Sequence, residues 1–170
     1  MTLKVTSAVI SWGPCWWKTS GMTHTVSEIT EKVPNSKVII VPEAATQLFE
    51  MWIEIWWKNW LSNEAFQDLI IKQQLHNELT AKRIIKNISS DIDHLILLHD
   101  RWLLDWAAYT LNDDQTINRK LFETLLNQNN TKKIEDWYDN YNAILHYQST
   151  AIGAEEFFTN KNNTHRKEDI

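Results

Sequence analysis

Short apolar runs that alternate with longer amphipathic segments are the feature of this chain that most restricts its fold. The runs contain few polar side chains, as expected for strands that are buried on both faces of a parallel sheet. They span Lys4 to Ile10, Lys37 to Val41, Asp93 to His99 and Ala143 to Tyr147. This alternation over 170 residues predicts an α/β fold, with a parallel sheet that is flanked by helices and joined by right-handed crossovers.

The segments between the runs predict the helices. They are expected at about 18–32, 43–53, 63–87, 102–111 and 116–128, and from Ala154 onward. The longest of them carries apolar residues at helical spacing, and either Ser62 or Asn63 would cap its first turn. In parallel sheets of this kind, ligands bind beyond the carboxyl ends of the strands, so the loops that begin there are the first place to look for chemistry.

The segment between the first strand and the first helix has the spacing of a phosphate-binding loop. It reads Ser11-Trp12-Gly13-Pro14-Cys15-Trp16-Trp17-Lys18-Thr19-Ser20. The pattern G-x-x-x-x-G-K-[ST] requires glycine at positions 12 and 17, because the backbone curls around the phosphates and leaves no room for a side chain. Both positions are tryptophan here. In this pattern Lys18 contacts the β- and γ-phosphates, Thr19 binds Mg²⁺, and residues 13–20 together hold the nucleotide.

The tryptophan content suggests why the two glycines are missing. The chain has 10 Trp and 3 Gly, whereas average usage predicts about 12 Gly at this length. One hypothesis is that most of these tryptophans are UGA codons of an organism that reads UGA as glycine; UGG codons at positions 12 and 17 would contradict it. The alternative is a natural Trp-rich protein with an aromatic surface for a membrane or a partner. With tryptophan in place, the rings of Trp12, Trp16 or Trp17 should lie near Asp100 and fill part of the phosphate site, and those of segment 56–60 should be exposed. Loop rings that point away from Asp100, with the 56–60 rings packed in a core, would favour the natural Trp-rich protein.

Several ionisable residues follow the predicted strands directly. Glu43, after the second strand, could accept the proton of a substrate hydroxyl, or simply be an acid favoured at a helix N-terminus. Asp100 ends the third strand, where a carboxylate could hold Mg²⁺, and Arg101 could bind phosphate oxygens. The alternative for both is a solvated surface ion pair. His99 is more typical of a structural residue, and Asp105 could either support the site or begin a helix.

Four ordered motifs resemble one known family. They are residues 11–20, Val41-Pro42-Glu43-Ala44-Ala45, the segment from His99 to Tyr109, and the segment from Ser149 to Glu168. Together they resemble the P-loop ATP/GTP-binding AAA-like family, which includes nicotinamide-riboside-kinase-like NTPases and translocation-defect-type GTP-binding proteins. Most departures from the family are tryptophans where the family has glycine.

The resemblance implies a P-loop NTPase fold that binds ATP or GTP with Mg²⁺. It implies that Lys18 and Thr19 bind the nucleotide and the metal, that Asp100 is the acid near the metal, and that Arg166 belongs to a mobile lid. It also implies a fifth strand and closing helices beyond Ile170, so that residues 1–170 would form a single nucleotide-binding domain that is incomplete at its C-terminus.

Charge and composition exclude several other classes. A net charge of −5 without any block of Lys or Arg argues against a general nucleic-acid binder. No apolar stretch approaches the ~18 residues of a membrane span, and the first apolar run is too short for a signal peptide. The single cysteine, Cys15, fits a reducing compartment, so a cytoplasmic location is expected.

The sequence therefore predicts a kinase-like NTPase that transfers phosphate to a small hydroxyl-bearing substrate. Its catalytic residues would be Glu43, Asp100, Arg101 and Arg166, with Thr19 and Asp100 at the metal. Two alternatives stay open: a nucleotide-binding regulator that acts through a partner, and a degenerate domain that binds no nucleotide because its tryptophans are real.

Overall fold

A computed structural model describes residues 3–12, 18–51, 61–88, 91–112, 114, 116–130 and 134–147. Its sheet has four parallel strands in the order β2-β3-β1-β4. The strands are β1 (Lys4–Trp12), β2 (Ser36–Val41), β3 (His94–Asp100) and β4 (Ala143–Tyr147). The helices are α1 (Lys18–Lys32), α2 (Ala44–Glu50), α3 (Asn63–Asn87), η1 (Leu103–Tyr109), α4 (Arg119–Gln128), α5 (Ile134–Trp137) and η2 (Tyr138–Asn140). The predicted α/β class with a parallel sheet flanked by helices is confirmed.

Most elements lie where the apolar pattern predicts them, and the differences have local causes. β1 continues beyond Ile10 because Trp12 still pairs with Tyr147 of β4. The helix expected at 43–53 ends at Glu50, and the one expected at 102–111 is a shorter 3₁₀ helix. α4 starts later than position 116, because the side chain of Asn118 accepts a hydrogen bond from the backbone N–H of Leu121 and so caps the helix. The short α5 was not predicted, and the helix expected after Ala154 lies outside the described residues.

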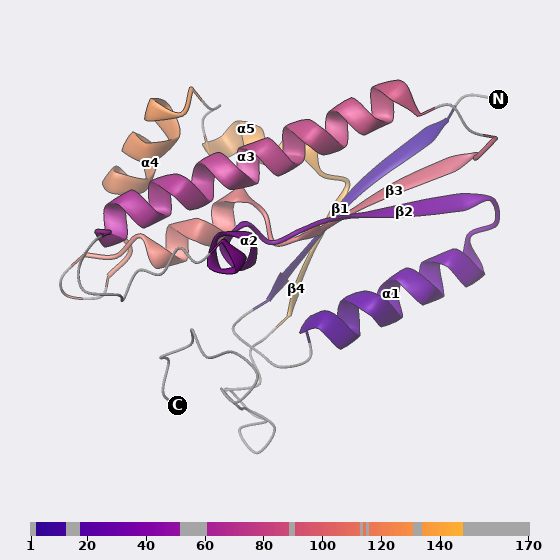
Figure 1. Cartoon of the computed structure of the whole chain (residues 1–170), viewed down its shortest axis with the longest axis horizontal. Helices are drawn as coiled ribbons and strands as arrows, with labels where there is room; N and C mark the ends of the chain where they lie inside the picture. The colour runs from indigo at the N-terminus through magenta and orange to yellow at the C-terminus, as the bar shows by residue number, and fades with distance from the viewer. Residues whose placement is uncertain are drawn as a thin grey trace, which may run out of the picture.

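The two faces of the sheet are covered by different helices. On one face Ile10 and Leu98 pack against Met22 of α1. On the other face Leu95 packs in a cluster with Ala81 of α3. Figure 1 shows α1 and α3 on opposite sides of the strands. This arrangement explains the nearly continuous apolar runs, since alternate side chains of the central strands are buried on both faces.

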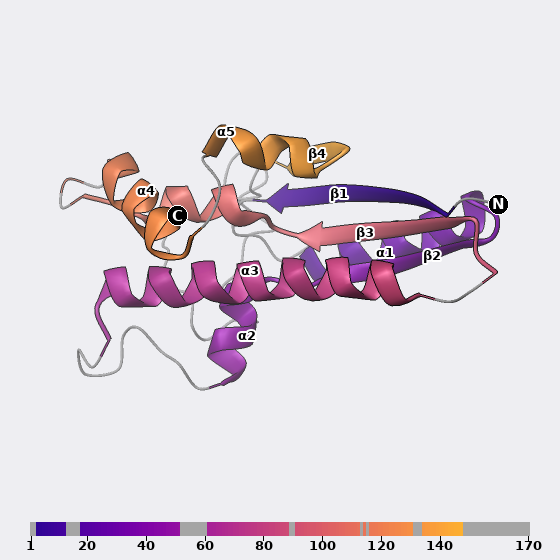
Figure 2. The same cartoon turned by 90° about the horizontal axis from the view of Figure 1, so that it is seen from above.

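A second apolar core lies beyond the carboxyl ends of the strands. The first half of α3, together with α2, η1 and α4, extends past the ends of β1 and β3 (Figures 1 and 2). Its buried side chains include Leu48, Phe66, Ile70, Phe122 and Leu125. Trp106 and Trp137 are also buried in this core. The helical layer therefore covers the edge of the sheet at which β1 and β3 end.

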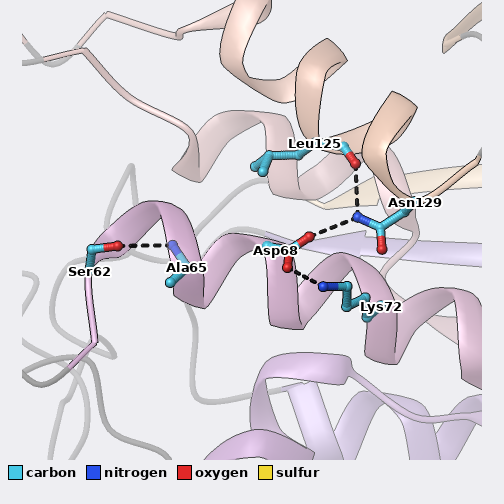
Figure 3. Close-up of polar contacts among 6 residues, drawn as sticks. All are labelled: Ser62, Ala65, Asp68, Lys72, Leu125 and Asn129. Carbon is cyan, nitrogen blue, oxygen red and sulfur yellow. Dashed lines mark hydrogen bonds and ion pairs between the residues drawn. The ribbon is translucent and has the colours of Figure 1, made fainter.

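Polar contacts fix the start of α3 and its position against α4. Ser62 Oγ accepts a hydrogen bond from the backbone N–H of Ala65 at 3.1 Å, as the predicted cap requires (Figure 3). Asn129 Nδ2 donates to Asp68 Oδ1 and to the carbonyl oxygen of Leu125, each at 2.8 Å. The asparagine thus joins the carboxyl end of α4 to the second turn of α3.

Candidate functional site

The carboxyl ends of β1 and β3 lie side by side at one edge of the sheet. Ile10 is the register partner of Asp100, and the backbone N–H of Arg101 donates to the carbonyl oxygen of Ile10 at 3.0 Å. β1 lies between β3 and β4 and ends at Trp12, and α1 begins at Lys18. Asp100 and the end of β1, after which the sequence places the predicted loop, therefore share one edge.

Asp100 occupies the last position of β3 and is half-buried. Side chains alternate between the two faces of a strand, so Asp100 lies on the same face as Leu98, which packs against Met22 of α1. The carboxylate therefore belongs to the face that carries α1, and the amino end of α1 is at Lys18. A carboxylate oxygen is a ligand that Mg²⁺ accepts, and the positive end of the helix dipole favours a phosphate anion on the same face.

Arg101 is buried and paired with Glu43. Its Nε lies 2.6 Å from Glu43 Oε1, and only 6% of the residue is exposed. The contact is an ion pair outside ideal hydrogen-bond angles, since Nε makes no well-aligned hydrogen bond within the described part of the chain. The guanidinium carbon also lies 5.6 Å from the ring centroid of Trp106 and 5.7 Å from that of Tyr109. Burial disfavours the charge, but Glu43 and other nearby acidic groups outweigh burial and raise the pKa of Arg101.

The second oxygen of Glu43 is engaged as well. Glu43 Oε2 accepts a hydrogen bond from Thr46 Oγ1 at 2.7 Å, within the first turn of α2. Glu43 and Arg101 are thus brought together as the strand-end pattern suggests, but each neutralises the other. The pair is buried, and it joins Arg101 to Glu43, whereas the sequence left open a solvated pair of Arg101 with Asp100.

The backbone of Arg101 is held in the left-handed region. Its φ is 70°, and the other non-glycine residues with positive φ in the described ranges are Asn35 and Asn130. Asparagine tolerates this conformation, whereas other residues pay about 1–2 kcal/mol for it. The turn carries the chain from β3 into η1 while the N–H of Arg101 still bonds to β1. Strain of this kind is concentrated at functional sites.

Asp105 joins η1 to β1. Ser11 Oγ donates to Asp105 Oδ1 at 2.6 Å, and Trp102 Nε1 donates to the same oxygen at 3.1 Å. Ser11 Oγ also lies 3.0 Å from Nδ1 of His146, its register partner on β4. Because the Ser11 proton is directed to Asp105, His146 has to donate from Nδ1. The sequence left the role of Asp105 open. It did not single out Ser11 or His146, although each is a polar residue near the end of an apolar strand and could have been noticed for that reason.

The other predicted site residues cannot be placed. Gly13, Pro14, Cys15, Trp16, Trp17 and Arg166 lie outside the described residues, as do the side chains of Lys18, Thr19 and Ser20. Their roles in nucleotide and metal binding stay predictions. The same holds for the expected positions of the tryptophan rings in the loop and in segment 56–60.

Trp102 and Trp106 are described, and both are buried. Trp102 packs edge-on against Tyr138 and Tyr141, with ring centroids 5.1 and 5.5 Å away. Trp106 packs against Arg101, and its Nε1 has no hydrogen-bond partner among the described residues. The φ of Trp102 is −132°, which any residue adopts. The two indole rings therefore contact Asp105 and Arg101 and fill space that glycine at these positions would leave open.

Comparison with models of protein families gives no match, and no curated protein matches the chain. None of the helices in the described ranges is long and apolar enough to cross a membrane. The function proposed for this chain therefore depends on its motifs and on the geometry of the sheet edge.

Proposed function

We propose that this chain is an ATP- or GTP-binding P-loop protein that acts as a kinase-like NTPase on a small hydroxyl-bearing substrate. The observation that carries the proposal is the succession of β1 and α1, separated only by segment 13–17, with Asp100 of β3 beside the end of β1. The parallel order β2-β3-β1-β4 is compatible with a P-loop-like fold. Lys18 and Thr19 stand where the pattern needs the phosphate-binding lysine and the Mg²⁺-binding hydroxyl.

The proposed catalytic roles follow from the residues at this edge. Asp100 supports Mg²⁺, and Arg101 stabilises the charge of the transferring phosphoryl group, as arginine does in phosphoryl transfer. Glu43 accepts the proton of the substrate hydroxyl, which requires the substrate to compete with Arg101 for the carboxylate. Arg166 supplies further positive charge from the C-terminal segment.

The Arg101–Glu43 pair also supports a second candidate function. Both side chains are largely buried and neutralise each other, and Arg101 also lies against two aromatic rings. A protein that keeps them paired binds nucleotide without transferring phosphate to a small molecule, and acts as a regulator. Substrate-dependent release of ADP or GDP separates the two, because a regulator releases it only slowly and independently of any added hydroxyl compound.

Lys18→Ala tests nucleotide binding in a protein whose loop carries Trp12→Gly and Trp17→Gly. Removal of the ammonium is expected to weaken ATP or GTP binding by about 1.5–3 kcal/mol, or roughly ten- to hundred-fold, because a charge-assisted hydrogen bond is lost. Isothermal titration calorimetry measures the change. Lys32→Ala, at the other end of α1, is the matched control and should leave the affinity unchanged. Equal affinities for the Lys18→Ala variant and its parent would remove the P-loop interpretation.

Asp100→Asn tests the metal role in the same glycine-containing background. Binding without Mg²⁺ should be unchanged or slightly tighter, because a carboxylate near the phosphates is neutralised. The additional affinity that Mg²⁺ confers should fall by at least about ten-fold, since a charged ligand is replaced by a neutral one. Titrations in the presence of Mg²⁺ and of EDTA measure the nucleotide affinity with and without the metal. A loss of the same size under both conditions would assign Asp100 a structural role instead.

A further inference from the structure

A cavity of about 190 Å³ lies between α3 and the sheet. It is on the face opposite α1, because the β-strand residues in its wall, among them Val5 and Leu97, pack in the cluster that contains Ala81 of α3. The segment that leads into β4, from Asn140 to Asn142, forms its other side. The cavity is separate from the proposed nucleotide site, so a ligand could bind in it whether or not the chain binds nucleotide.

One part of the wall is apolar and uncharged. Val5, Leu97 and Ile85 supply aliphatic surface. His99 is 3% exposed, and its Nε2 lies 2.8 Å from Ser7 Oγ. This side of the cavity therefore suits a hydrocarbon group.

The α3 side of the cavity carries two opposite charges one turn apart. Glu78 is 4% exposed, and its Oε1 accepts a hydrogen bond from Tyr141 Oη at 2.7 Å. Burial raises the pKa of Glu78, although Tyr141, Gln74 and Lys82 oppose the shift. Lys82 is exposed at the rim and forms no ion pair with any residue that the structure describes. The cavity thus offers a desolvated carboxylate inside and a cation at its mouth.

We propose that this cavity binds a small zwitterion with an aliphatic side chain, of the α-amino acid class. The ligand ammonium would pair with Glu78, its carboxylate with Lys82, and its side chain would lie against the apolar wall. A buried carboxylate gains most from a cationic partner that replaces lost hydration. A simple carboxylic acid would place a second anion beside Glu78, and a simple amine would leave Lys82 without a partner. The volume is that of about six water molecules, which suits an aliphatic amino acid.

Three ligands of related shape test the proposal on the full chain by isothermal titration calorimetry. Leucine carries both charges, 3-methylbutylamine lacks the carboxylate and 4-methylpentanoate lacks the ammonium. Leucine should bind at least about ten-fold more tightly than 4-methylpentanoate and a few-fold more tightly than 3-methylbutylamine. The reason is that the buried ion pair with Glu78 contributes more binding free energy than the exposed ion pair with Lys82. Equal affinities for the three, or no saturable binding of leucine, would overturn the proposal.

Two variants assign the contacts. Glu78→Gln can still accept the Tyr141 hydrogen bond, and it should weaken leucine by at least about ten-fold while 4-methylpentanoate is not weakened. Lys82→Ala should weaken leucine by only about two- to five-fold, since the pair is exposed, and should leave the amine unchanged. Lys86→Ala, one turn further along α3 and outside the described cavity wall, is the control and should have no effect. If Glu78→Gln folds and binds leucine as tightly as the unmodified chain, Glu78 does not bind the ligand ammonium and the proposal is overturned. If Glu78→Gln does not fold, the comparison of the three ligands on the unmodified chain tests the proposal.

Discussion

Glu43→Ala is expected to lower the free energy of unfolding by about 3–5 kcal/mol, because it leaves the buried charge of Arg101 without its partner. Arg101 is 6% exposed, and its Nε lies 2.6 Å from the carboxylate that the substitution removes. The rings of Trp106 and Tyr109 pack against the guanidinium but supply no carboxylate in place of Glu43. Urea denaturation followed by circular dichroism measures the loss as a lower midpoint at constant slope.

An exposed pair of the same geometry provides the control. Arg119 Nε lies 2.7 Å from Glu123 Oε1 on α4, with the two side chains 68% and 45% exposed. Glu123→Ala should cost less than about 1 kcal/mol, since water replaces the lost partner. The double variant Glu43→Ala/Arg101→Met should recover much of the loss, because no unpaired charge remains. If Glu43→Ala cost no more than Glu123→Ala, the buried pair would not contribute to stability as the geometry indicates.

The parts of the fold that depend on local sequence were predictable. α1 starts and ends at the expected residues, and α3 begins at the Ser62 cap and ends at Asn87. Each of the four predicted strands is present, since long apolar runs and helix caps act within a few residues of the positions that they determine. Asp100 also lies at the expected strand end, because the carboxyl ends of parallel strands share one edge.

The partners of the site residues were not predictable in the same way. The pairing of Arg101 with Glu43 depends on how α2 and η1 pack beyond the sheet, and no local pattern encodes that packing. The contact between Ser11 and His146 depends on the register of β1 with β4, which is set by long-range hydrogen bonds. The helix α5 was missed because only four residues form it, too few for a helical period to be recognised.

The different environments of Glu78 and Lys82 in the cavity wall could not be predicted from the sequence for a related reason. Glu78 and Lys82 stand among many charged residues of α3, and their sequence positions alone suggest an exposed i, i+4 pair. In the structure Glu78 is buried and accepts a hydrogen bond from Tyr141, whereas Lys82 is exposed. His99, which the sequence favours as a structural residue, is buried and lies within hydrogen-bond distance of Ser7. Its position in a cavity wall follows from the sheet and not from the chain order.

Acidification from pH 7 to pH 4 is expected to remove about 3 kcal/mol of folding free energy through His99. The folded-state pKa of His99 is lowered to about 4 from 6.5, chiefly by burial. Above pH 6.5 the imidazole is neutral in both the folded and the unfolded chain, so it has no effect there. Between pH 6.5 and 4 the unfolded chain binds a proton that the folded chain does not, and stability falls by up to about 1.4 kcal/mol per pH unit.

The contribution of His99 has to be separated from that of Glu78, which acts in the opposite direction. The folded-state pKa of Glu78 is raised, chiefly by burial, so the folded chain takes up that proton more readily, and stability rises as the pH falls through this value. His99→Gln removes the titrating imidazole but keeps groups that can bond to Ser7, and its stability should fall less steeply with pH than that of the unmodified chain. Urea midpoints at several pH values between 7 and 4, measured for both proteins, give the difference. Because Glu78 is present in both, its effect cancels, and parallel curves would show that the buried imidazole does not control acid stability.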